Sequence, residues 1–190
     1  MADAPASLED LRQAMLAIDA ELVALLGRRA ALSLAVGECK QASGQSDVFR
    51  PGREAALMRQ LEAMNCGPLP IDHLRGIYRE ILSSSRTLQR PERVAFLGPP
   101  DLPGLGFSPA QSAGRELLGS LTEFQPKPSL DAVFAVVADG SCALGVVPLE
   151  NAEKTLEGCF LRYPELYILV ETDSSGGRFA VIGRTPSENR

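Results

Sequence analysis

The sequence predicts an all-α domain over residues 7–90, followed by a small α/β domain over residues 92–186. Two observations predict this division. Apolar residues recur every three or four positions through the first part, which is the period of an amphipathic helix. After "QRPE", at residues 89–92, short apolar runs bounded by proline and glycine replace that spacing. Such runs are typical of strands and short helices in one α/β unit.

The first helix is expected from Ser7, a suitable N-cap, to Ser43. Its apolar stripe, which Arg29 interrupts, consists of Leu8, Leu11, Met15, Ile18, Leu22, Leu25, Leu32 and Val36. At about 1.5 Å per residue the helix is about 55 Å long, far longer than an average helix. Because a chain of 20.3 kDa cannot cover such a stripe alone, we expect a second subunit to cover it.

Two shorter helices are expected to complete the first domain. Pro51 suits the first position of a helix that continues to Met64, and a third helix is expected from Ile71 to Gln89. The breaker segment "NCGPLP" separates them. The apolar stripe of the third helix consists of Leu74, Ile77, Tyr78, Ile81, Leu82 and Leu88.

Composition excludes several classes of function. The net charge of −5 is carried by residues 91–190, so no basic field for nucleic acid is expected. The longest apolar run is too short to span a membrane, and no leader is evident, so a cytoplasmic protein is expected. The four cysteines form no C-x-x-C pair, and His73 is the single histidine. Neither a metal site nor a cofactor is therefore expected.

Three cations of the first helix suggest how the subunits are arranged. Arg29 and Lys40 are eleven residues apart, close to three whole turns, so they share a face. Arg12 lies seventeen residues before Arg29, or about 26 Å along the axis. It can reach the same pocket only from another copy of the helix, which favours an intertwined homodimer.

Three segments carry a family resemblance: "LEDLRQAMLAIDAELVALLGRRAALSLAVGECK", "FRPGREAAL" and "SSSRTLQ". They resemble the helical chorismate mutase domain of bifunctional chorismate mutase–prephenate dehydratases, over about residues 7–90. In that family the long first helices cross between two subunits. The resemblance implies catalytic roles for Arg29, Lys40 and Gln89, and substrate contacts from Arg12, Arg53, Glu54 and Ser85. Arg50 departs from the family, because some relatives carry an aspartate there near the substrate hydroxyl, so Glu54 is the expected contact for that group.

The chemistry implied by this resemblance suits these residue types. Chorismate becomes prephenate, in aromatic amino-acid biosynthesis, by a pericyclic rearrangement that needs no nucleophile, base or cofactor. A catalyst holds the flexible dianion in a compact chair and stabilises negative charge on the breaking ether oxygen. Guanidinium groups fit the two carboxylates, and Lys40 and Gln89 are expected to donate to the ether oxygen.

Each polar position also has a structural interpretation when it is taken alone. Arg29 suits a snorkelling or ion-paired arginine, and Lys40 suits a charge near a helix end. Arg53 with Glu54 suits a first-turn salt bridge. The coincidence of all seven positions with the family pattern favours the mutase. A non-catalytic regulatory dimer stays as an alternative.

The second domain is predicted from five short segments. "RVAFLGPP", "CALGVVPLEN", "LYILVE" and "GRFAVIGR" are expected to form strands, and "SLDAVFAVVADG" a helix capped by Ser129. The proline-rich segments "PPDLPGLGFSPAQ", residues 99–111, and "FQPKPS", residues 124–129, are expected to be loops.

The segments "VAFLGP", "GFSPAQ", "LGVVPLEN" and "GRFAVIG" resemble motifs of the prephenate dehydratase catalytic domain. Only residues 152–177 stand where that family inserts a whole second lobe, so one lobe is expected. The family's T-R-F motif reads Gly177-Arg178-Phe179, without the threonine hydroxyl. With the sequence ending at Arg190, no phenylalanine-sensing domain is expected. Dehydratase activity is therefore not expected, and a fully bifunctional enzyme is the alternative.

Overall fold

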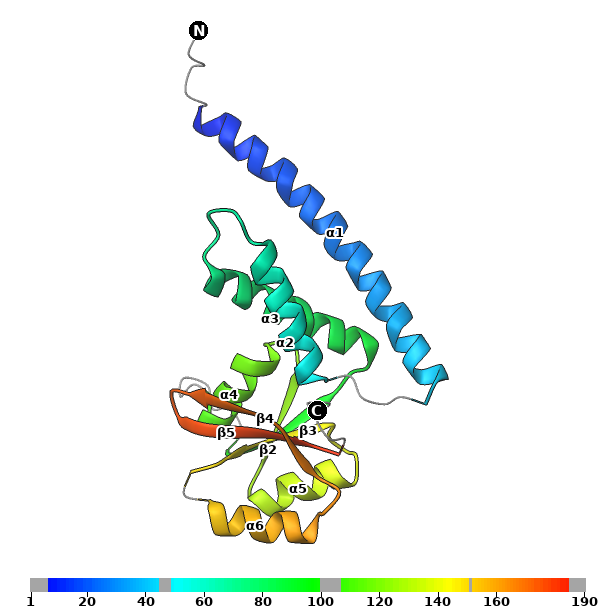
Figure 1. Ribbon diagram of the computed structural model, residues 1–190, viewed down its shortest axis with the longest axis vertical. Coiled ribbons are helices and arrows are strands. Elements are labelled where there is room, and N and C mark those ends of the chain that lie inside the picture. The colour runs from blue at the N-terminus through cyan, green and yellow to red at the C-terminus, as the bar shows by residue number, and fades with distance from the viewer. Residues whose placement is uncertain (1–6, 45–48, 100–106, 151, 185–190) are drawn as a thin grey trace.

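The computed structural model describes residues 7–44, 49–99, 107–150 and 152–184. The helices of these residues are α1 (Leu8–Ala42), α2 (Pro51–Met64), α3 (Ile71–Gln89), α4 (Pro109–Leu118), α5 (Leu130–Ala138) and α6 (Glu153–Arg162). The strands are β1 (Arg93–Leu97), β2 (Glu123–Lys127), β3 (Leu144–Pro148), β4 (Tyr167–Ser174) and β5 (Gly177–Gly183). The predicted order of a helical region followed by a small α/β region is confirmed (Figure 1).

Helix α1 begins where its capping residues place it. The Ser7 hydroxyl accepts from the Asp10 amide while the Asp10 carboxylate accepts from the Ser7 amide, a reciprocal capping box. The Ser7 hydroxyl donates to the Asp10 carboxylate at 2.6 Å, and this bond, together with the one from the Ser7 amide, holds the pKa of Asp10 below its usual value. The N-terminal half of α1 projects beyond the other helices (Figure 1). Its exposed apolar side chains include Leu8, Leu11, Met15, Ile18, Leu22 and Leu25. Within the described chain this apolar face has no cover.

The C-terminal half of α1 approaches α3 closely at Gly37. A Cβ built on Gly37 would lie 2.9 Å from the carbonyl oxygen of Gln89 and 3.0 Å from its Cα. Both are backbone atoms, so any larger residue would force the two helices apart. Gly37 and Ser33 are the buried residues of α1, and they mark the line along which it contacts α3.

The α/β region contains one mixed sheet with strand order β2-β1-β3-β5-β4. The β1–β2 and β1–β3 pairs are parallel, and the β3–β5 and β4–β5 pairs are antiparallel. Helices α5 and α6 cover one face, and α4 lies on the other face with the helical domain (Figure 1). Alternate strand residues therefore enter two apolar cores. Val147 and Ile182 point into the first core, and Val146 and Val181 into the second.

Two loop predictions in this region were wrong. Helix α4 begins inside the segment 99–111, because Ser108 caps the Gln111 amide and Pro109 occupies the first helical position. Strand β2 includes Pro126 of the segment 124–129. It is an edge strand, where a missing amide donor costs no internal hydrogen bond.

Helix α6 was not expected either, and with β4 it occupies most of residues 152–177. Gly106 and Asn151 of the dehydratase-like motifs, most of the loop before Phe107, and residues 185–186 of the second predicted domain lie outside the described residues. In the part of the chain that is described, no helix is long and apolar enough to span a membrane.

Candidate functional site

Helices α1, α2 and α3 enclose a cavity of about 240 Å³. Apolar and small side chains form part of its wall: Leu32, Ser33, Val36, Leu57 and Leu82. Its charged, amide-bearing and hydroxyl-bearing side chains include Arg29, Lys40, Arg50, Arg53, Glu54, Ser85, Arg86 and Gln89. Six of the seven residues proposed from the sequence therefore lie around one pocket, and Arg12 is the exception.

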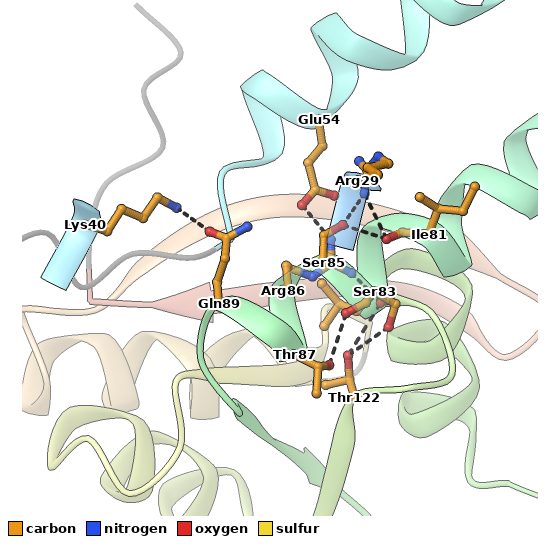
Figure 2. A network of polar contacts seen from close by, with 11 residues as sticks. Arg29, Lys40, Glu54, Ile81, Ser83, Ser85, Arg86, Thr87, Gln89 and Thr122 are labelled. Atoms are coloured by element: carbon orange, nitrogen blue, oxygen red, sulfur yellow. Dashed lines mark hydrogen bonds and ion pairs between the residues drawn. The ribbon is translucent and has the colours of Figure 1, made fainter. Parts of the chain in front are cut away.

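Arg29 is held in place by α3. Its Nη1 donates to the hydroxyl of Ser85 and, at 3.4 Å, to the carbonyl of Ile81 (Figure 2). The Ser85 hydroxyl itself donates to the Ile81 carbonyl at 2.9 Å. These bonds hold one nitrogen of the guanidinium, so its position at the pocket wall is set by groups of α3 rather than by solvent.

Lys40 reaches the same pocket from one end. Its ammonium group donates to the amide oxygen of Gln89 at 3.1 Å (Figure 2). A protonated lysine has only donors, so the amide group of Gln89 must present its oxygen to Lys40. The Gln89 amide nitrogen then carries its own donors away from Lys40. A cation and an amide donor thus stand side by side at this end of the pocket.

Helix α2 supplies the third wall. Pro51 starts the helix, as the sequence predicted, so Arg50 at the N-cap and Arg53 and Glu54 in the first turn meet the pocket together. The Glu54 carboxylate already has an ion-pair partner, because its Oε1 accepts from Arg86 Nη1 at 2.5 Å. Its second oxygen has no such contact with Arg86.

The charge balance of this pocket favours an anion. Its lining includes the cations Arg29, Lys40, Arg50, Arg53 and Arg86, and among the described residues Glu54 is its one carboxylate. A cleft lined by one sign of charge concentrates oppositely charged ligands. No group of three or more His, Cys, Asp or Glu side chains suited to a metal occurs among the described residues.

Arg12 does not reach this pocket within one chain. It lies near the N-terminal end of α1, where 67% of its side chain is exposed and Glu9 Oε2 is 3.9 Å from its Nη1. A single chain therefore provides the pocket without this predicted contact.

Residues 11–90 match the family model of chorismate mutase type II. This segment is a chorismate mutase domain of type II. The match covers α2, α3 and nearly all of α1, so the family's helices are the ones that enclose the cationic pocket.

Curated relatives of the chain are described as bifunctional chorismate mutase/prephenate dehydratases. The protein of Neisseria gonorrhoeae is 34% identical over 141 residues, which is 74% of this chain and 36% of the relative. That of Pseudomonas aeruginosa is 34% identical over 149 residues, 76% of this chain and 39% of the relative. That of Stutzerimonas stutzeri is 31% identical over 192 residues, 96% of this chain and 50% of the relative. The chain thus spans half or less of the length of these relatives.

A solved structure described as "GqqA- a novel type of quorum quenching acylases" shares 22% identity over half of this chain and 48% of its own, with a TM-score of 0.36. This likeness is too low to support an assignment of fold or function.

Arg86 is the residue of the mutase domain that sequence reasoning missed. Only 6% of it is exposed, and its guanidinium contacts Glu54 at the pocket. The family pattern assigned roles to Ser85, one position before it, and to Gln89, three positions after it. The sequence carried no signal for it, because the apolar spacing of α3 predicts a different buried face, whereas the structure buries Ser83, Ser85 and Arg86.

Proposed function

We propose that this chain catalyses the rearrangement of chorismate to prephenate. The observation that carries the proposal is the pocket of about 240 Å³ in the mutase domain, whose described lining residues include five cations and one carboxylate. In this reaction an ether C–O bond breaks while a C–C bond forms, and no proton or electron leaves the molecule. The pocket needs only to bind a compact dianion and to stabilise developing charge, which fixed donors do well.

The pocket side chains suit distinct parts of such a dianion. Arg29 and Arg53 offer guanidinium groups that pair with carboxylates in two-point geometry. Ser85 holds the Arg29 guanidinium, and its place in the site is to keep that group oriented.

The remaining side chains face the ether and hydroxyl oxygens in this proposal. Lys40 and the amide nitrogen of Gln89 donate to the ether oxygen, whose negative charge grows as the bond breaks. The Glu54 oxygen that Arg86 leaves unbound accepts from the substrate hydroxyl. Catalysis by these groups requires no bound metal or cofactor.

We further propose that two chains form the active species, with α1 of each crossing to the other. The exposed apolar stripe of α1 needs a cover, and a second copy of the same helix provides one. In that arrangement the partner's α1 would bring Arg12 to the pocket as a further carboxylate contact. The cytoplasmic location expected from the sequence stays a prediction.

The test is the loss of chorismate absorbance with formation of prephenate by the purified chain. Lys40→Ala should lower kcat/KM about a hundredfold or more, because a preorganised donor to the ether oxygen is lost. Lys154→Ala, which removes an exposed lysine of α6, is the control and should leave the rate unchanged. A folded wild type without turnover would instead favour the non-catalytic regulatory dimer.

A further inference from the structure

Arg86 contacts both the pocket and the α/β domain. Its Nη1 lies 2.5 Å from Glu54 Oε1 in α2 (Figure 2). Its Nη2 donates to the carbonyl oxygen of Leu118, the last residue of α4. A buried guanidinium stays charged and needs acceptors for its donors. One acceptor therefore comes from the mutase pocket and one from the neighbouring domain.

Phe49 makes a second connection between the two parts. It directly precedes Arg50, the N-cap of α2, and is 8% exposed. Its side chain belongs to the apolar cluster on the α4 face of the sheet, with Leu118. The Arg86 guanidinium lies over its ring at 5.6 Å from the centroid. The start of α2 is thus packed into the core of the α/β domain.

The end of α4 is fixed against α3 by several polar contacts. The Glu80 carboxylate accepts from the Ser120 amide at 3.0 and 3.1 Å and from its hydroxyl at 2.7 Å. Gly119 has a φ of +81°, and a Cβ there would lie 2.5 Å from the Cβ of Ser83. This close approach sets where the Leu118 carbonyl meets Arg86.

We propose that Arg86 is a positioning residue that makes the mutase pocket depend on the α/β domain. The Leu118 carbonyl holds the guanidinium, and the guanidinium holds Glu54. Without the Arg86–Glu54 ion pair, the Glu54 carboxylate is free to turn toward Arg53 or Arg29 and to neutralise cations that the substrate needs. This inference rests on the proposed function, since it assigns a role to Arg86 in the same pocket.

Arg86→Met tests the pocket side of this connection. The variant should raise KM for chorismate by about ten- to a hundredfold, with a smaller change in kcat, because a misplaced carboxylate opposes binding of a dianion. Arg86→Lys keeps the charge but reaches one acceptor fewer, so it should recover part of the loss. Arg75→Met is the matched control. Arg75 also lies on α3 and pairs with a glutamate of α2, Glu62, at 2.7 Å, but outside the pocket.

The deciding measurement repeats Arg86→Met in a Glu54→Gln background. Since a neutral amide cannot neutralise Arg53 or Arg29, the second substitution should then add no more than about twofold to the loss. A residue that merely supports the fold would cost the same factor in both backgrounds. That equality would overturn the proposal.

Gly119→Ala tests the α/β side without touching the pocket. The added methyl group should push the end of α4 away from Ser83, withdraw the Leu118 carbonyl and raise KM in the same direction as Arg86→Met. Glu80→Gln is a milder variant in case the first one folds poorly. Gly140→Ala is the control, because Gly140 has a φ of +82° and the atoms nearest to a Cβ there belong to the flexible Arg184 side chain. Equal KM values for the Gly119 and Gly140 variants would contradict the connection.

Failure of the proposed function would look different. A folded wild type that never converts chorismate overturns the mutase assignment itself. The energetic coupling between Arg86 and Glu54 can then still be measured by denaturant unfolding. The losses of unfolding free energy from Arg86→Met and Glu54→Gln should be strongly non-additive, whereas those from Arg86→Met and Arg75→Met should be additive. Additivity of Arg86 with Glu54 would remove the structural basis of the proposal as well.

Discussion

The Lys40 ammonium group donates a hydrogen bond of 3.1 Å to the amide oxygen of Gln89, although the two residues are 49 positions apart. The bond joins the last turn of α1 to the last residue of α3. It closes one end of the pocket and fixes which way the Gln89 amide faces. Two of the three residues proposed to be catalytic therefore orient each other.

Gln89→Glu should make the activity depend on acid. An amide does not titrate, so the wild type should keep its rate between pH 6 and 8. A carboxylate at this position would face the Lys40 ammonium, which lowers the pKa of that carboxyl group and keeps it charged at neutral pH. A charged carboxylate has no proton to donate to the ether oxygen. The variant should be about a hundredfold slower at pH 7 and recover as the pH falls. The kcat/KM profile from pH 4 to 8 measures this, and equal profiles for both proteins would argue against the Gln89 role.

Gly37→Ala should damage the same contact through the backbone. The new Cβ would meet the carbonyl oxygen of Gln89 at 2.9 Å, so α1 and α3 must separate and Lys40 must retreat from Gln89. We expect a loss of about 1–3 kcal/mol in unfolding free energy, together with a lower kcat/KM. Gly27→Ala is the control on the same helix, because a Cβ there meets nothing within 4 Å. It should stabilise the helix by about 0.5–1 kcal/mol. Similar effects of the two substitutions would mean that the helices do not touch at Gly37.

A mixture of Arg12→Ala and Lys40→Ala chains should regain activity. If each pocket takes Arg12 from the partner chain and Lys40 from its own, a heterodimer of the two variants has one intact pocket and one doubly damaged pocket. Equal mixing with subunit exchange should restore about a quarter of the wild-type rate. Assays before and after exchange measure the gain.

Independent measurements check the assembly itself. Sedimentation at micromolar concentration should show a species of twice 20.3 kDa. A mixture no more active than its separate components, or a species of 20.3 kDa alone, would contradict the intertwined dimer.

The cysteines should divide into two pairs in reactivity. Cys39 and Cys66 are exposed, whereas Cys142 and Cys159 are buried, and burial raises the pKa of both buried thiols. Two thiols should react with a disulfide reagent at pH 8 in the native protein, and the other two only after unfolding. The stabilisation from the buried thiols is full below the unfolded pKa of about 9.0 and is lost as the pH rises toward the higher folded values. Four fast thiols in the native protein would contradict this packing.

The sequence predicted the three helices of the mutase domain because local chemistry sets their ends. Ser7 with Asp10, and Pro51 in the first position of α2, act within one turn of the chain. The pocket was also largely predictable, since the family pattern fixes polar residues at spaced positions. Capping chemistry also marks the start of α4, where Ser108 is the N-cap and Pro109 the first helical residue, although this segment was expected to be a loop.

The role of Arg86 could not be predicted from periodicity. Its helix carries an apolar stripe that includes Ile77 and Leu88, yet Ile77 is 50% exposed while Ser83, Ser85 and Arg86 are buried. The pattern of a single helix does not tell which of its faces a later domain will cover. Here the end of α4 covers the polar face, and the acceptor for Arg86 is a backbone carbonyl, which has no sequence signature.

The α/β domain should not convert prephenate to phenylpyruvate, although the curated relatives are named for both activities. That reaction needs a positioned proton donor and a pocket that excludes water. Gly177 stands where the related motif has a threonine, and it adopts a φ of +114°. The following Arg178 pairs with Glu171 at 2.7 Å on the neighbouring strand. The described hairpin therefore turns this arginine toward its own strands.

Gly177→Thr should fail to create the activity and should also destabilise the protein. A β-branched residue at this φ is strained by about 1–3 kcal/mol, and its Cβ would lie 3.1 Å from the Glu150 carboxylate. Phenylpyruvate formation from prephenate at neutral pH, corrected for the spontaneous acid-catalysed reaction, measures activity, and thermal unfolding measures stability. If the wild type forms phenylpyruvate and Arg178→Ala abolishes this activity, the hairpin belongs to a working dehydratase site. That result would contradict the prediction.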